Sequence, residues 1–263
     1  MTSTQFDTAA LLPAIQQAAR DAGAKIMAIY ATDFEHRTKD DASPVTEADE
    51  AAEAIIVPIL EELTPGVPVV AEEAAAAGRI PDVGNGPFWL VDPLDGTKEF
   101  LKRNGEFTVN IALIENNAPV LGVVYLPALS CLYSGIVGKG AWRQDGDGTK
   151  TAIAVRPEPA AGLTVIGSRS HGDASEMGAF LAPRLIAETV SAGSSLKFCR
   201  VAEGAADVYP RLGRTMEWDV AAGHAVLAAA GGTVTLTDGT PFTYAKNPIF
   251  ENPHFVAWGG VRP

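Results

Sequence analysis

The feature that most constrains this chain is a short apolar segment that runs directly into two aspartates. Residues 88–92 have the composition of a buried strand, and Asp92 and Asp95 then enclose a Pro-Leu pair before Gly96. Proline fixes its own φ and lacks a backbone donor, while glycine permits tight geometry, so we expect the strand to end at Asp92 in a sharp turn. Such a turn aims two carboxylates and a carbonyl at one point, and these oxygen ligands suit Mg²⁺. A plain surface turn is the alternative, because Asp-Pro and Asp-Gly pairs are common turn formers.

The excess of acidic over basic residues limits the kinds of molecule that this protein is expected to bind. The 263 residues contain 20 Lys plus Arg against 32 Asp plus Glu, a formal net charge of −12, which argues against nucleic-acid polymers and anionic membranes as main partners. An anionic small substrate stays open, because bound divalent cations reverse the local field of a carboxylate-rich site. No stretch approaches the ~18 consecutive apolar residues of a transmembrane helix. Cys131 and Cys199 form no CxxC pair, so buried free thiols in a reducing cytoplasm are favoured over a disulfide.

Hydrophobic periodicity predicts an α+β chain without regular βαβ alternation. Helices are expected at 7–31, at 47–63 after a Thr46 N-cap, in one or two pieces within 173–190, from 193–195 to 203, and from Asp219 to the Gly231-Gly232 stop. Strands are expected at 67–71, 88–92, 107–115, 119–126, 130–137, 163–167, 233–237 and 254–258, with a mobile connection over 74–87 and a polar turn region at 142–148. This mixture predicts a layered sandwich in two halves, 1–151 and 152–263, which form one catalytic unit.

Three separated motifs give the chain a resemblance to a known family. They are Glu72-Glu73, the segment from Trp89 to Thr97, and Trp218-Asp219-Val220-Ala221-Ala222-Gly223. In this order they resemble the lithium-sensitive, Mg²⁺-dependent phosphatases of the inositol monophosphatase family, and the resemblance covers nearly the whole chain. It implies a layered αβαβα sandwich of the inositol monophosphatase and fructose bisphosphatase type, and hydrolysis of a phosphate monoester.

The resemblance also implies a set of metal ligands. Glu72, Asp92 and the Leu94 carbonyl would hold a first Mg²⁺, while Asp92, Asp95 and Asp219 would hold a second, as in other two-metal hydrolases. A third, weaker ion near Glu72 is common in the family. Read without the family, Glu72 is also consistent with a solvated strand end, and Asp219 with a carboxylate that the dipole favours at a helix N-terminus.

By the same resemblance, Asp49 and Thr97 would orient and deprotonate the attacking water. Asp49 has a second interpretation, because it lies three residues after Thr46 and completes a capping box there. Both interpretations are compatible. The Gly96 and Thr97 amides, just past the turn, are candidates to hold a phosphate oxygen.

Several further segments resemble the bacterial branch of 3′(2′),5′-bisphosphate nucleotidases. They are 41–49, Lys98-Glu99-Phe100, 103–113, Ser168-Arg169-Ser170-His171, 193–199 and 206–211. The resemblance implies that Ser194, Lys197 and Arg211 meet the 5′-phosphate side and that His171 meets the nucleoside. Glu72, Asp95, Gly96, Thr97 and Asp219 would lie around the phosphate that is cleaved. Lys and Arg give charge-assisted bonds to phosphate, although solvated surface charges, and an ordinary surface histidine at His171, are the alternatives.

The implied activity is removal of the 3′-phosphate of adenosine 3′,5′-bisphosphate, which yields AMP and phosphate and clears a by-product of sulfate assimilation. Mg²⁺ dependence and lithium inhibition belong to the same expectation. The protein is expected to be a cytoplasmic monomer or homodimer, and the resemblance to bacterial relatives leaves peripheral association with the cytoplasmic face of the inner membrane open. An inositol monophosphatase or a fructose-1,6-bisphosphatase is the alternative enzyme. A non-catalytic sensor of phosphate ligands is the alternative from another class, although no expected ligand or water-activating residue is missing from the sequence.

Overall fold

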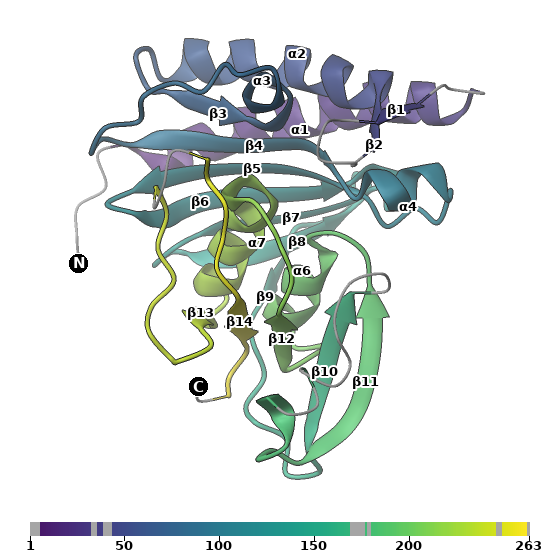
Figure 1. The fold of residues 1–263 in the computed structure, drawn as a ribbon, viewed down its shortest axis with the longest axis vertical. Coiled ribbons are helices and arrows are strands. Elements are labelled where there is room, and N and C mark those ends of the chain that lie inside the picture. Colours follow the sequence, from purple (N-terminus) through teal and green to yellow (C-terminus); the bar gives the residue numbers. More distant parts are fainter. Residues whose placement is uncertain are drawn as a thin grey trace.

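The computed structural model describes residues 6–32, 36–38, 44–168, 177, 180–245 and 249–261. These residues form alternating layers of helices and sheets, as Figure 1 shows. One helical layer covers the outer face of a seven-stranded sheet, a second helical layer lies between that large sheet and a five-stranded small sheet, and β1 (His36–Thr38) pairs with β2 (Pro44–Thr46) beside them. The predicted layered α+β architecture is therefore confirmed.

The outer helical layer consists of α1 (Thr8–Tyr30) and α2 (Glu47–Leu63), both predicted from their apolar periodicity. Asp7 caps α1 by accepting from the amides of Ala9 and Ala10. Thr46 and Asp49 form the predicted capping box of α2, which satisfies amides that have no partner inside the helix. The buried faces of both helices pack on the large sheet, and this packing places the start of α2 at one end of that sheet.

The large sheet has its strands in chain order, with β3 parallel to β4 and all later neighbours antiparallel. Its strands are β3 (Val69–Ala71), β4 (Phe88–Asp95), β5 (Thr108–Glu115), β6 (Ala118–Leu126), β7 (Cys131–Ile136), β8 (Gly140–Asp145) and β9 (Thr151–Ile153). Alternate residues of β5 face opposite ways: Ile111 and Leu113 pack under α1 and α2, while Ala112 and Ile114 pack under the middle layer. Both faces of the central strands are therefore buried.

The middle layer consists of α6 (Leu196–Ala202) and α7 (Glu217–Ala229). Gly122 on β6 and Gly135 on β7 allow α7 to approach the large sheet closely. A Cβ added at Gly122 would lie 2.6 Å from the Ala222 carbonyl oxygen, and one added at Gly135 would lie 2.7 Å from the Val226 Cα. The two glycines thus set how deeply α7 sits against the sheet.

The small sheet has the order β11-β10-β12-β14-β13. Its strands are β10 (Leu163–Ser168), β11 (Ile186–Ala192), β12 (Val208–Arg211), β13 (Thr233–Leu236) and β14 (Phe255–Trp258). One face packs on α6 and α7 through residues such as Tyr209 and Phe255. The other face contacts Phe180 and Leu181 through Val165 and Trp258, in a separate apolar cluster. The outer helical layer that the family resemblance implies falls on a region of which only part is described.

Three expectations about local structure were wrong. Residues 140–145 form strand β8 rather than a polar turn region, because their backbone pairs along the whole of β7. Within 173–190, where one or two helices were expected, residues 177, 180 and 181 are helical, but the end of the range belongs to strand β11. The four-residue spacing of Ile186 and Val190 suits a strand as well as a helix. Residues 72–76 form a short helix, α3 (Glu72–Ala76), where a mobile connection was expected.

The expected division of the chain at 151 and 152 falls inside β9, which pairs with β8. The division itself stays a prediction. Both Cys131 and Cys199 are buried and free, as expected. Among the described helices, none has the length and apolar character that a bilayer span requires.

Candidate active site

The Asp-Pro-Leu-Asp segment lies in β4 itself, which corrects the expectation that the strand ends at Asp92. β4 continues to Asp95, and its register against β5 shifts between the two aspartates. The Leu94 amide donates to Asp92 Oδ1 at 3.0 Å, which fixes the rotation of that carboxylate. Gly96 follows with a φ of 91°, a value that favours glycine. An irregular strand, rather than a sharp turn, thus presents both carboxylates.

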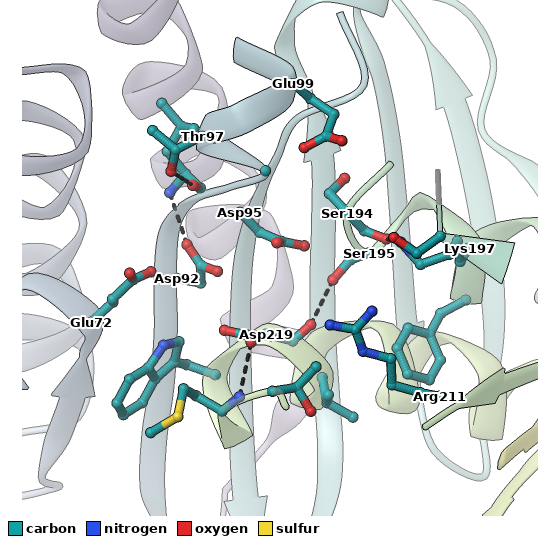
Figure 2. A pocket seen from close by; sticks show the side chains of 18 of the residues that line it. Glu72, Asp92, Asp95, Thr97, Glu99, Ser194, Ser195, Lys197, Arg211 and Asp219 are labelled. Carbon is teal, nitrogen blue, oxygen red and sulfur yellow. Dashed lines mark hydrogen bonds between the residues drawn. The ribbon is translucent and has the colours of Figure 1, made fainter. Parts of the chain in front are cut away.

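Three elements bring carboxylates to one point beside this strand. Asp92 lies on β4, Glu72 is the first residue of α3, and Asp219 lies in the first turn of α7, where it accepts from the Met216 amide at 2.8 Å. One carboxylate oxygen from each of these residues lies within 4.8 Å of the other two. Asp95 is outside that trio but lines the same cavity, and Figure 2 shows its carboxylate beside them.

Burial and mutual repulsion set the pKa values of the carboxylates in this cluster. Desolvation, followed by repulsion from Glu72, Asp95 and Asp219, raises the pKa of Asp92 well above its ordinary value. Desolvation and then repulsion from Asp95 and Glu72 raise the pKa of Asp219 in the same way. Desolvation raises the pKa of Asp95 to about 6, with the Lys197 cation acting in the opposite direction. A divalent cation would relieve this repulsion, and a donor set made only of oxygens fits a hard ion such as Mg²⁺.

Asp49 and Thr97 approach each other across the edge of the cluster. Thr97, the first residue of α4 (Thr97–Leu101), has its Oγ1 3.4 Å from Asp49 Oδ1 and 3.4 Å from the Leu94 carbonyl oxygen. The other Asp49 oxygen accepts from the Thr46 amide at 2.8 Å and from the Thr46 hydroxyl at 2.7 Å. One buried carboxylate therefore caps α2 and also faces Thr97, so the capping box is confirmed and the role in water activation stays a prediction.

Glu53 is a residue of this region that sequence reasoning missed. Its two carboxylate oxygens accept from the amides of Glu73 and Ala74 at 2.8 and 2.9 Å, so it caps the short helix that begins with Glu72. Glu53 lies four residues after Asp49 on α2, and therefore on the same helix face. That spacing was a visible signal, but its meaning depends on α3, which was not predicted.

The wall of the cavity opposite the carboxylates is basic. Lys197 is only 4% exposed, and its Nζ donates to the Ser194 carbonyl oxygen at 2.6 Å and lies 5.3 Å from the centroid of the Tyr209 ring. Desolvation lowers the pKa of Lys197 to about 8, while the Asp95 charge acts to raise it. Lys197 is thus not the solvated surface charge of the alternative interpretation. Arg211 donates to the Arg214 carbonyl oxygen at 2.9 Å, and its Nε has no hydrogen-bond partner among the described residues.

The segment before α6 joins the basic wall to the carboxylates. Ser194 has a φ of 45° and donates through Oγ to the Glu106 carbonyl oxygen at 3.0 Å, while the Gly193 amide donates to the Glu106 carboxylate at 2.8 Å. Ser195 donates through Oγ to the Asp219 carbonyl oxygen at 2.7 Å, and its amide bonds the Asp95 carboxylate. Glu106 was matched only as part of a segment resemblance, and its role in holding this turn depends on contacts far apart in sequence.

These groups line one cavity of about 240 Å³. Figure 2 shows the carboxylates of Glu72, Asp92, Asp95 and Asp219 on one side and Lys197 and Arg211 on the other. The lining includes every predicted site residue that the structure describes except Asp49, which meets the cavity through Thr97: Glu72, Asp92, Leu94, Asp95, Gly96, Thr97, Ser194, Lys197, Arg211 and Asp219. His171 lies outside the described residues, as do Arg169 and Ser170.

Comparison with known proteins gives matches along nearly the whole chain. The family model of the inositol monophosphatase family matches residues 7–257. The 3′(2′),5′-bisphosphate nucleotidase CysQ of Escherichia coli (strain K12) is 49% identical over 247 residues, which cover 93% of this chain and 98% of that protein. The protein of the same name from Buchnera aphidicola is 44% identical over 251 residues, covering 94% of this chain and 93% of that protein.

Solved structures agree with these matches. The structure of CysQ from Bacteroides thetaiotaomicron has a TM-score of 0.80 and 37% identity, and the match covers 98% of this chain and 100% of that one. The structure of an inositol monophosphatase from Anabaena has a TM-score of 0.74 and 29% identity, over 97% of this chain and 93% of that one. The predicted resemblance is confirmed, and the chain belongs to the inositol monophosphatase family.

Proposed function

We propose that this chain is a Mg²⁺-dependent 3′(2′),5′-bisphosphate nucleotidase that converts adenosine 3′,5′-bisphosphate to AMP and phosphate. The observation that carries the proposal is the division of one cavity into a carboxylate side and a basic side. A metal-bound phosphate beside the carboxylates and a second phosphate beside Lys197 and Arg211 would each meet opposite charge. Relatives named as bisphosphate nucleotidases over the full length support the same substrate class.

The proposed metal ligands are those that the family resemblance implied. Glu72, Asp92 and the Leu94 carbonyl would hold one Mg²⁺, and Asp92, Asp95 and Asp219 would hold another. A third, weaker ion would bind near Glu72. When bound, Mg²⁺ neutralises phosphate charge and lowers the pKa of coordinated water. The mutual repulsion and raised pKa values of Asp92 and Asp219 support a cationic occupant.

Thr97 and Asp49 act on the attacking water in this proposal. Thr97 Oγ1 lies between Asp49 Oδ1 and the Leu94 carbonyl oxygen, so its proton has an acceptor on either side. In the reaction Thr97 orients a water molecule, and Asp49 takes the proton through the Thr97 hydroxyl. The Gly96 and Thr97 amides hold an oxygen of the phosphate that is cleaved.

Lys197 and Arg211 hold the phosphate that is not cleaved, with Ser194 beside them. The desolvation that lowers the pKa of Lys197 also strengthens its attraction for a nearby anion. Arg211 offers a guanidinium whose Nε has no hydrogen-bond partner in the described part of the chain, so a phosphate would satisfy it. Contact of His171 with the nucleoside stays a prediction, as does a monomer or homodimer in the cytoplasm.

A phosphate-release panel tests the substrate. Adenosine 3′,5′-bisphosphate, inositol 1-phosphate and fructose 1,6-bisphosphate are each incubated with the enzyme and Mg²⁺, and the nucleotide is expected to have the highest kcat/KM. Faster release from either of the other esters would contradict the proposal. Nucleotide binding without any phosphate release would indicate a sensor instead.

A comparison of two nucleotides tests the basic wall. Arg211→Ala should raise KM for adenosine 3′,5′-bisphosphate by roughly tenfold or more, because a charge-assisted phosphate bond is lost. It should leave KM for 3′-AMP nearly unchanged, because 3′-AMP has no 5′-phosphate. Arg20→Ala is the control, since Arg20 bonds Gln144 outside the cavity. If Arg211→Ala raised KM equally for both nucleotides, the proposal that the basic wall binds the 5′-phosphate would be contradicted.

A further inference from the structure

Two polar side chains of β5 lie buried with unpaired atoms. Thr108 and Asn110 are both 0% exposed, and Thr108 Oγ1 and both Asn110 side-chain heteroatoms have no hydrogen-bond partner within the described ranges. The next two residues on the same face of β5, Ala112 and Ile114, are apolar and belong to the core. This face of the strand therefore changes from apolar to polar at Asn110.

The change occurs beside the candidate metal ligands. In the pairing of β4 with β5, Asp92 lies opposite Asn110 and Asp95 lies opposite Thr108. Directly opposed residues of antiparallel strands have their Cβ atoms about 4.5–5.5 Å apart on the same face. That face is the one covered by α7, which carries Asp219. Each unpaired polar side chain thus lies next to one carboxylate of the site.

The carboxylates of Asp92 and Asp95 can accept further hydrogen bonds from these two side chains. Asp92 accepts the Leu94 amide through one oxygen, and Asp95 accepts the Ser195 amide. An ionised carboxylate has about four acceptor positions, so both groups can accept further bonds after they also bind a cation. A buried polar group without a partner destabilises a fold, and this cost ends when a partner is supplied.

We propose that Asn110 and Thr108 are positioning residues for the metal site, in which the Asn110 amide donates to Asp92 and the Thr108 hydroxyl donates to Asp95 when a divalent cation is bound. Hydrogen bonds to a ligand from the side away from the ion hold its orientation and contribute to metal affinity. The Asn110 carbonyl is left as an acceptor for a water proton, since Mg²⁺ keeps several waters. The inference rests on the metal site of the proposed function.

Apolar replacements of similar shape separate this role from a purely structural one. Thr108→Val and Asn110→Leu remove the unpaired atoms and leave most of the volume, so the metal-free proteins should unfold at a temperature equal to or above that of the unchanged chain. If the residues position ligands, the same variants should bind Mg²⁺ roughly tenfold more weakly. A structural role would move stability and leave metal affinity unchanged.

The experiment measures Mg²⁺ binding to the full chain by titration calorimetry without substrate, together with thermal unfolding in EDTA. Thr108→Ser retains the hydroxyl and should keep most of the metal affinity that Thr108→Val loses. Thr8→Val is the matched control, because Thr8 Oγ1 is also unpaired among the described residues, and Thr8 is 1% exposed on α1 outside the cavity. Thr108→Ser also decides the matter if Asn110→Leu fails to fold.

The outcomes distinguish the two proposals. Unchanged Mg²⁺ affinity in Thr108→Val and Asn110→Leu would overturn the positioning role while the nucleotidase could still be active. Weakened affinity in these variants, in a chain that does not hydrolyse adenosine 3′,5′-bisphosphate, would support the positioning role and contradict the proposed function. An unchanged chain that binds no divalent cation would overturn both.

Discussion

At the scale of single residues, Asp92 has an environment that strongly disfavours its charged form. It is 1% exposed, and three other acidic side chains raise its pKa after desolvation has done so. The Leu94 amide donates to its carboxylate at 3.0 Å. Such a residue weakens the metal-free fold and gains most from a bound cation, which is the balance expected of a functional site.

Asp92→Asn should abolish nearly all phosphatase activity and also the thermal stabilisation by Mg²⁺. The unchanged chain should gain about 2.7 kcal/mol of folding stability at a Mg²⁺ concentration 100 times the dissociation constant. The variant should show no such gain, while its unfolding temperature in EDTA should not fall, because a repelled charge has been removed. Thermal unfolding with and without Mg²⁺ measures both. A folded, fully active Asp92→Asn protein would disprove the assigned ligand set.

Asp49 and Thr46 share a capping box but should differ in catalysis. Thr46→Ala should cost about 1 kcal/mol of stability through loss of the helix cap, with little change in kcat. Asp49→Asn should lower kcat by roughly 100-fold or more, because the proton acceptor for the Thr97 hydroxyl is lost. Denaturant unfolding and steady-state kinetics on both variants make the comparison. Similar kcat values in the two variants would mean that Asp49 serves only the cap.

At the scale of secondary-structure elements, α2 and α7 place the groups of the proposed reaction. Asp49 and Glu53 lie about one turn apart on the same face of α2. Asp49 contacts Thr97, and Glu53 caps α3. α7 carries Asp219 and rests on Gly122 and Gly135. Small displacements of either helix would therefore separate the proposed ligands, which must lie within a few ångströms of one another to share a cation.

Glu53→Gln should weaken Mg²⁺ binding by roughly tenfold, because one of two α3 amides loses its acceptor and Glu72 loses its fixed position. Thr64→Val is a suitable control: Thr64 is also buried, at the other end of α2, and accepts from Trp89 Nε1 at 2.8 Å. The control should lose stability without losing metal affinity. Calorimetric titration of both variants decides the question, and equal affinities would leave Glu53 with a structural role alone.

Gly122→Ala should destabilise the protein by about 1–3 kcal/mol through overpacking. It should also lower activity, because the new methyl meets Ala222 and Ala225 at 2.6 Å and α7 must move away with Asp219. Gly86→Ala, where an added Cβ has no neighbour within 4 Å, should change neither. Chemical unfolding and turnover are measured for each. A stable, fully active Gly122→Ala protein would show that the position of α7 is not set by this contact.

At the scale of the whole molecule, the site is assembled from both halves of the chain. Asp92 comes from the large sheet, Asp219 from α7, and Lys197 from α6, while β9 extends the large sheet past the midpoint of the chain. The inner face of the large sheet, which includes Ala112 and Val124, is covered by α7. Neither half can bury this surface alone.

Residues 1–151 expressed alone should therefore fail to fold. Loss of α7 exposes the apolar inner face of the large sheet, whose burial is the main favourable contribution to stability. The full chain should unfold in one transition that is the same by circular dichroism and by tryptophan fluorescence. A stably folded fragment, or two separate transitions in the full chain, would contradict this account.

The positions of α1, α2, α7 and the central strands were predictable because their signals are local. Apolar residues at helical spacing, the Thr46 cap and the Gly231-Gly232 stop each act within a few residues of the chain. The strands β8 and β11 were missed because few of their residues are buried, so burial left only a weak pattern. Their strand conformation comes from pairing with neighbours.

For the site, the sequence by itself determined the acidic residues Glu72, Asp92, Asp95 and Asp219 and the family to which they point, because those motifs are contiguous. The tertiary structure alone decided that Glu53 caps α3, that Glu106 holds the Ser194 turn, and that Asn110 faces Asp92. It also decided that β4 runs on through Asp95 instead of ending in a turn. These features depend on strand register and helix packing between distant segments, which no short stretch of sequence encodes.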